Sequence, residues 1–219
     1  AADLAPVTAR QAAIAQTPPA ARTPLVANSA AESTADALPA VGPARSEASA
    51  DIIAEVSGIA ACGEEEVLGL GATLESVVAL APHARHRATT EFHSVKPPPI
   101  SIRDYVSRIR EHFQCSCECY VLCLVYIDSL IQRHHSMVID SLTSHRLIAC
   151  SMTLAAKFQD DVYYSNKYYA RVAGLSLQEL NSLEKHMLEL LDYRLFISPA
   201  QFEQYRKIMR SAACSQGLL

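Results

Sequence analysis

The chain has 219 residues, of which 50% are hydrophobic and 19% are charged, and its formal net charge is −4 at pH 7. These values allow a sizeable core and argue against a general nucleic-acid binder, which would carry a basic surface. No apolar run reaches the roughly 20 residues that a membrane-spanning helix needs. The cysteine count is odd, seven, and the first residues show no signal-peptide pattern, so we expect a reducing compartment, the cytoplasm or the nucleus.

The first part of the chain is rich in alanine, serine, threonine and proline and nearly free of aromatic residues. Such a segment buries too little apolar surface to offset the entropy lost on ordering it. We therefore expect residues 1–50 to form a disordered tail. Within residues 51–96 we expect a helix at Glu64–Leu80 and a polar loop, although Gly69 and Gly71 lower the helix propensity of that stretch.

From Pro99 to Pro199 there is no intervening proline, and Gly174 is the only glycine. A β-protein of this length would need frequent turn residues, so the stretch predicts an all-α domain. Apolar spacing and capping residues divide the domain into helices. In chain order we expect a helix that opens at Ser101, helices at Glu118–Arg133, Ser141–Phe158 and Lys167–Val172, and helices that open at Ser176 and Ser198.

The helices at Glu118–Arg133 and Ser141–Phe158 are apolar on nearly all sides, which is typical of helices at the centre of a bundle. Two other helix starts carry capping pairs, because Ser101 precedes Asp104 and Ser176 precedes Glu179 at the required spacing. Gly174 suits the left-handed position that often ends a helix.

Cys115, Cys117, Cys119 and Cys123 form the densest cluster of potential metal ligands. Zinc sites usually combine this kind of cluster with a second, distant pair, and none follows, so buried thiols are the favoured interpretation. A thiol- or metal-dependent enzyme is the alternative. No enzyme motif occurs, and Asp160-Asp161 has no further acids close by. We expect no metal, cofactor, catalytic residue or small-molecule substrate.

Four tyrosines lie close together after the third of these helices, at Tyr163, Tyr164, Tyr168 and Tyr169. They could simply pack the ends of helices. They could also form a protein-recognition surface, because tyrosine combines an apolar ring with a polar hydroxyl. The residues alone leave both interpretations open.

An ordered series of short motifs runs through the second half of the chain. It comprises Phe92–Tyr105 (FHSVKPPPISIRDY), His145-Arg146-Leu147, Ala155-Ala156-Lys157-Phe158, Asp160–Asn166 (DDVYYSN) and Tyr168–Val172 (YYARV). This series resembles the phosphate-type cyclins, also called P- or U-type, over about residues 64–210. The resemblance implies a five-helix cyclin box preceded by an N-terminal helix. It divides the chain into the tail, the N-terminal helix and loop, a box at 97–213 and a C-terminal tail at 214–219.

The resemblance also implies a cyclin-dependent protein kinase as partner. Lys157 and Glu184 match the lysine and glutamate with which cyclins hold the kinase, and an internal salt bridge is the simpler role for them. The other kinase-binding positions that it implies are Phe158, Asp160, Asp161, Tyr164 and Asn166. The residues expected to maintain the box are His145, Arg146, Ala155, Tyr169 and Gly174.

Three positions depart from the family pattern. Thr143 stands where asparagine is usual, Ala173 replaces the first of two glycines, and Cys117 replaces a common proline. These departures affect the expected local geometry, and the turn at Ala173 in particular.

The expected function is therefore that of a non-catalytic cyclin that activates a kinase in cell-cycle or phosphate signalling, with no nucleic-acid or membrane partner. The alternative is a cyclin-fold adaptor in a transcription or nucleic-acid-linked assembly, which the near balance of charges in the box disfavours.

Overall fold

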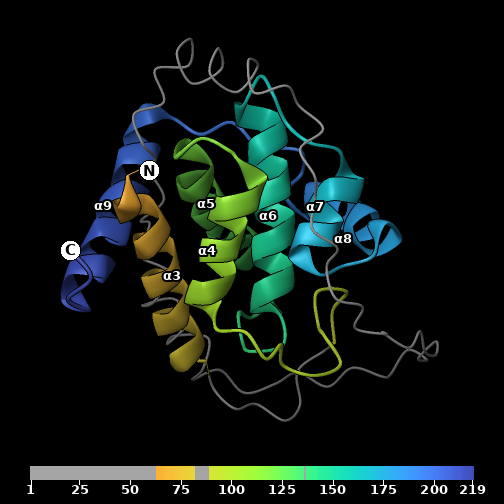
Figure 1. Cartoon of the computed structure of the whole chain (residues 1–219), viewed down its shortest axis with the longest axis horizontal. Coiled ribbons are helices and arrows are strands. Elements are labelled where there is room, and N and C mark those ends of the chain that lie inside the picture. Colours follow the sequence, from red (N-terminus) through yellow and green to blue (C-terminus); the bar gives the residue numbers. More distant parts are fainter. Residues whose placement is uncertain (1–62, 82–88, 136) are drawn as a thin grey trace. The chain divides into compact units, whose positions relative to one another are not determined.

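The computed structural model describes residues 63–81, 89–135 and 137–219, and in these ranges it contains helices and no strand (Figure 1). The helices are α3 (Glu64–Ala79), α4 (Ile102–Phe113), α5 (Glu118–Arg133), α6 (Ser144–Gln159), α7 (Asn166–Ala173), α8 (Leu177–Leu190) and α9 (Pro199–Ser215). The all-α prediction is confirmed: α3 precedes the five helices α4–α8, and α9 follows them. The expected disordered tail, residues 1–50, lies outside the described residues. Among the residues that the structure describes, no helix is long and apolar enough to cross a membrane.

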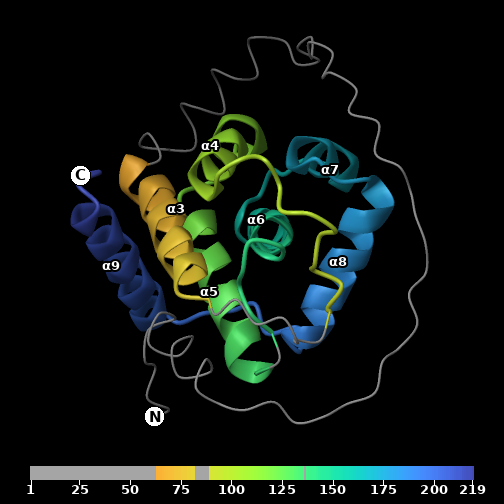
Figure 2. The ribbon, with the colours of Figure 1, turned by 90° about the horizontal axis from the view of Figure 1, so that it is seen from below.

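The helices α5 and α6 form the centre of the bundle, as their apolar surfaces predict. Figure 2 shows α6 end-on, with α4, α5, α7 and α8 around it. Most residues of α5 and α6 are buried, and the largest buried side chains include Tyr120 and Tyr126 of α5. A helix without a wide polar face is stable only where neighbours cover it on all sides, and these two helices are covered in this way.

Serine caps begin three of the helices, as the spacing predicts. The Oγ atoms of Ser101, Ser176 and Ser198 accept hydrogen bonds from backbone N–H groups three residues later, at N···O distances of 3.1, 3.1 and 3.3 Å. These bonds satisfy donors that have no partner inside the helix. The predicted start of α6 at Ser141 was three residues early, because the Asp140 carboxylate accepts the N–H groups of Leu142 and Thr143 and holds a turn there.

The helix α7 ends at Ala173, and its C-cap residue Gly174 has a left-handed φ of +74°. Ala173, the residue that departs from the family pattern, is the last residue of the helix and keeps a negative φ. The positive φ therefore falls on the one residue without a Cβ atom, and the alanine leaves the turn intact.

Glycines in α3 allow a close approach to α9. A Cβ atom added to Gly69 would lie 2.7 Å from the Cβ of Met209. Two ion pairs reinforce this contact, with Glu66 3.0 Å from Arg206 and Glu65 2.5 Å from Arg210. The glycine that lowers the helix propensity of α3 is thus required by the packing of another helix.

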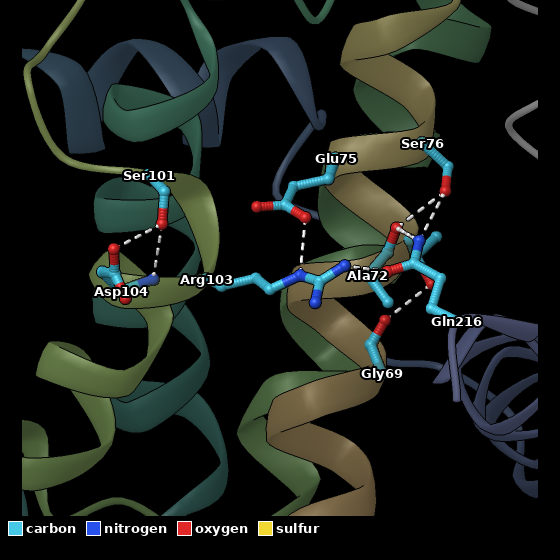
Figure 3. Close-up of polar contacts among 9 residues, drawn as sticks. Gly69, Ala72, Glu75, Ser76, Ser101, Arg103, Asp104 and Gln216 are labelled. Atoms are coloured by element: carbon cyan, nitrogen blue, oxygen red, sulfur yellow. Dashed lines mark hydrogen bonds and ion pairs between the residues drawn. The ribbon is translucent and has the colours of Figure 1, made fainter. Parts of the chain in front are cut away.

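Polar contacts also join α3 to α4 and to the end of α9 (Figure 3). Arg103 of α4 pairs with Glu75 of α3 at 2.6 Å and donates to the side chain of Gln216. Gln216 in turn donates to the carbonyl of Ala72, at 3.2 Å. Residues from three helices that are distant in sequence therefore meet at this junction.

Candidate functional site

Three helices contribute to a polar cluster made by Lys157, Asn166 and Glu184. The ammonium of Lys157, at the end of α6, donates to Oε1 of Glu184 on α8 at 2.6 Å and to Oδ1 of Asn166 at 3.2 Å. The amide nitrogen of Asn166, which begins α7, donates to the other carboxylate oxygen of Glu184 at 2.6 Å. Each side chain contacts both others, so the cluster fixes the ends of α6 and α7 against α8.

The sequence positions explain how each helix presents its residue. Lys157 lies in the last turn of α6, where the helix dipole favours a positive charge. Asn181 and Glu184 are three residues apart on α8 and therefore share a face. Both use that face to accept hydrogen bonds from the amide of Asn166, at 2.8 Å for Asn181. Asn181 was not among the predicted site residues, although its spacing from Glu184 carried the signal.

The cluster is accessible at one side. The side chain of Lys157 is 32% exposed and that of Glu184 is 11% exposed, so the pair is neither sealed in the core nor free in solvent. Phe158 is 48% exposed, and Val162 and Tyr163 follow at 55% and 52%. Lys157 and these exposed apolar side chains therefore lie close together in the sequence, at the end of α6 and in the loop that follows it.

The adjacent acids Asp160 and Asp161 have different surroundings. Oδ2 of Asp160 accepts the backbone N–H of Ser116 at 3.0 Å and the thiol of Cys119 at 3.5 Å. Asp161 is exposed on the loop between α6 and α7. The first carboxylate is therefore engaged within the chain, and the second is available to a partner.

The tyrosines divide into an inward and an outward group. Tyr169 is fully buried against Phe113, with ring centroids 4.4 Å apart. The hydroxyl of Tyr164 donates to Oε1 of Gln114 at 2.6 Å, and that of Tyr168 donates to the carbonyl of His112 at 2.9 Å. Tyr168 and Tyr169 thus attach α7 to the end of α4, and Tyr164 attaches the loop before α7 to Gln114, whereas Tyr163 is exposed.

The residues expected to maintain the box lie at internal junctions. The Nε2 atom of His145 is 3.0 Å from the carbonyl oxygen of Ile100, and burial lowers the pKa of this histidine. Arg146 donates to the carbonyl of His93 at 2.8 Å and pairs with Glu179. Ala155 is fully buried in α6. Arg146 thus connects the segment before α4 to α8. The backbone N–H of Glu179 also donates to the Ser176 cap.

The cysteine cluster is divided between the core and the turn before α5. Cys119 and Cys123 are buried, and burial is the main cause that raises the pKa of Cys123. Cys115 and Cys117 are partly exposed. Within the described ranges, no three histidine, cysteine, aspartate or glutamate side chains come together in a metal-binding arrangement. A protonated thiol in such a setting packs as a small apolar group.

Comparisons with known proteins agree with this architecture. The cyclin family model matches residues 15–195. Cyclin-U1-1 of Arabidopsis thaliana is 45% identical over 114 residues, which are 52% of this chain and 54% of the relative. Cyclin-P4-1 of Oryza sativa subsp. japonica is 39% identical over 124 residues, or 57% and 58% of the two chains.

A fungal relative is also similar. The PHO85 cyclin-like protein psl1 of Schizosaccharomyces pombe is 33% identical over 141 residues, 64% of this chain and 58% of the relative. The chain thus spans little more than half the length of these curated relatives. With the family match and the helical box together, this chain belongs to the cyclin family as a P/U-type cyclin with a single cyclin box.

Proposed function

We propose that this cyclin binds and activates a cyclin-dependent protein kinase, as a regulatory subunit without catalytic activity of its own. The observation that carries the proposal is the partly exposed pair of Lys157 and Glu184 beside the exposed side chain of Phe158. The name of the fission-yeast relative, a PHO85 cyclin-like protein, supports a kinase of the PHO85 type as the partner to test.

Activation would follow from selective binding to one state of the kinase. A protein kinase is active when a lysine of its β3 strand pairs with a glutamate of its regulatory helix. A surface that binds the paired state more tightly than the unpaired state shifts the equilibrium toward it. Lys157 can donate to backbone carbonyls of the partner, and Phe158, Val162 and Tyr163 can bury apolar area against it.

Asp161 suits a second contact with the kinase. It is an exposed carboxylate four residues after Lys157, while Asp160 is engaged by Ser116 and Cys119. An arginine of the kinase activation segment could form a charge-assisted hydrogen bond with Asp161, as it would with a phosphate group. Asp161→Asn should therefore weaken kinase activation more than it weakens kinase binding, and unchanged activation would remove this contact from the proposal.

A binding experiment with a matched control tests the main proposal. The full chain is mixed with a purified PHO85-type kinase, and complex formation and phosphorylation of a model substrate are measured. The double variant Lys157→Ala with Glu184→Ala should lose both, with its helical circular dichroism retained. The control is Lys185→Ala. Lys185 follows Glu184 in the sequence, and the side chain of this lysine is 77% exposed.

The outcomes separate specific docking from general disruption. Binding that survives in the double variant would contradict the role of the cluster. A wild-type chain that does not bind any tested kinase would contradict the proposed function itself. Loss of binding in the Lys185→Ala control would also count against the cluster, because that lysine lies outside it.

A further inference from the structure

The turn between α4 and α5 contacts the loop between α6 and α7. Gln114, at φ +49°, ends α4 in a left-handed conformation and accepts the hydroxyl proton of Tyr164 at 2.6 Å. Ser116 donates its N–H to Asp160 at 3.0 Å. The turn and the loop are 44 residues apart at the Ser116–Asp160 contact and 50 apart at the Gln114–Tyr164 contact. The two segments are therefore held together only by tertiary contacts.

The Asp160 carboxylate forms hydrogen bonds within the chain, whereas the Asp161 carboxylate is exposed. Asp160 is partly buried and its bonds go to the N–H of Ser116 and the thiol of Cys119, neither of which is a cation. Such a site needs a hydrogen-bond acceptor at one position and does not need the negative charge. Removal of the acceptor would leave the Ser116 N–H without its partner, which costs more than the bond itself is worth.

We propose that Asp160 is a positioning residue, which fixes the loop between α6 and α7 onto the α4–α5 turn so that Asp161 and Tyr163 stay exposed in one arrangement. This inference rests on the proposed function, because Asp161 and Tyr163 are assigned there to the docking surface. A loop that is ordered before binding loses less conformational entropy when the partner arrives. The contribution of Asp160 to kinase binding is thus indirect and comes through the geometry of its neighbours.

The chemistry of the two acids gives a crossed test. An asparagine at position 160 keeps a carbonyl oxygen that can accept from Ser116, whereas an alanine does not. Asp160→Asn should bind the PHO85-type kinase within about twofold of wild type, and Asp160→Ala should bind about fivefold or more weakly, the scale of one lost hydrogen bond. Asp161 should behave in the opposite way, with Asp161→Asn already impaired in activation.

Amide hydrogen exchange of residues 160–165 in the free chain is the second measurement. Exchange should be faster in Asp160→Ala and unchanged in Asp160→Asn and Asp161→Asn. If Asp160→Ala fails to fold, Tyr164→Phe removes the hydroxyl that bonds Gln114 and should speed exchange of the same loop.

Two results would overturn the inference. Equal loss of kinase affinity in Asp160→Asn and Asp160→Ala, with exchange unchanged, would show that the charge acts directly on the partner. Wild-type exchange in both Asp160→Ala and Tyr164→Phe would show that the turn does not hold the loop. A wild-type chain that binds no kinase contradicts the proposed function alone, because the exchange measurement needs only the free protein.

Discussion

The ammonium nitrogen of Lys157 lies 2.6 Å from Oε1 of Glu184, although the two residues are 27 positions apart in the sequence. The pair holds α6 against α8, and its lysine is still partly accessible to a partner. Stability and partner binding therefore depend on the same atoms, and the two effects must be measured separately.

A double-mutant cycle measures how much this pair contributes to the free energy of unfolding. The single variants Lys157→Ala and Glu184→Ala and the double variant are unfolded with urea. Because the pair is partly exposed, we expect a coupling of about 1 kcal/mol, near the upper end for surface pairs and well below buried ones. Lys157→Ala should destabilise the fold more than Lys185→Ala, since it leaves a largely buried Glu184 without its cation. Purely additive single variants would show that the pair does not stabilise the fold.

The close approach of α3 and α9 predicts that one glycine cannot be replaced. In Gly69→Ala the new methyl group would meet the Cβ and backbone of Met209 at 2.7 Å, so the two helices must move apart. We expect a loss of about 1–3 kcal/mol in the free energy of unfolding.

Gly71→Ala is the matched control in the same helix. Its methyl group would meet Cγ of Arg103 at 3.2 Å, a contact that a shift of a few tenths of an ångström relieves. The gain in helix propensity, up to about 1 kcal/mol, should offset the small shift that is needed. Equal stabilities of the two variants would contradict the packing argument.

Gly174 should be sensitive to substitution for a different reason. Its φ is +74°, and an added Cβ atom would meet nothing within 4 Å. The cost of Gly174→Ala is therefore conformational, about 1 kcal/mol, and Gly174→Asn should cost less because asparagine tolerates this region. Thermal unfolding of the two variants tests the order. A more stable alanine variant would mean that the turn adopts another conformation.

The fold should lose stability as the pH falls, in part through His145. Burial lowers the pKa of this imidazole, so the folded chain binds its proton less readily than the unfolded chain does. Stability from this residue is complete above the ordinary histidine pKa of about 6.5 and declines as the pH falls from there through the folded-state value. Urea unfolding between about pH 7 and pH 5 should show a flatter profile for His145→Gln than for wild type.

The wild-type chain, unfolded at the same pH values, supplies the control for this measurement. A profile of His145→Gln that parallels the wild type would remove His145 as the cause.

The sequence by itself determined the helices and the family. Helix starts depend on residues close together in the sequence, because a serine cap and its N–H partner are three residues apart. The burial of α5 and α6 follows from the absence of a wide polar face on these helices. The family motifs also named Lys157 and Glu184. Such local patterns can be read without any knowledge of how the helices pack.

Only the tertiary structure decided which groups meet between helices. Gly69 weakens α3 when that helix is considered alone, and it is needed because Met209 of α9 approaches at that point. Asp160 and Asp161 are adjacent residues of the same type. Their surroundings differ because Ser116 and Cys119 form hydrogen bonds with Asp160. The physical reason is the same in both cases: steric contact and hydrogen bonding act over a few ångströms in space, between residues whose separation along the chain carries no periodic signal.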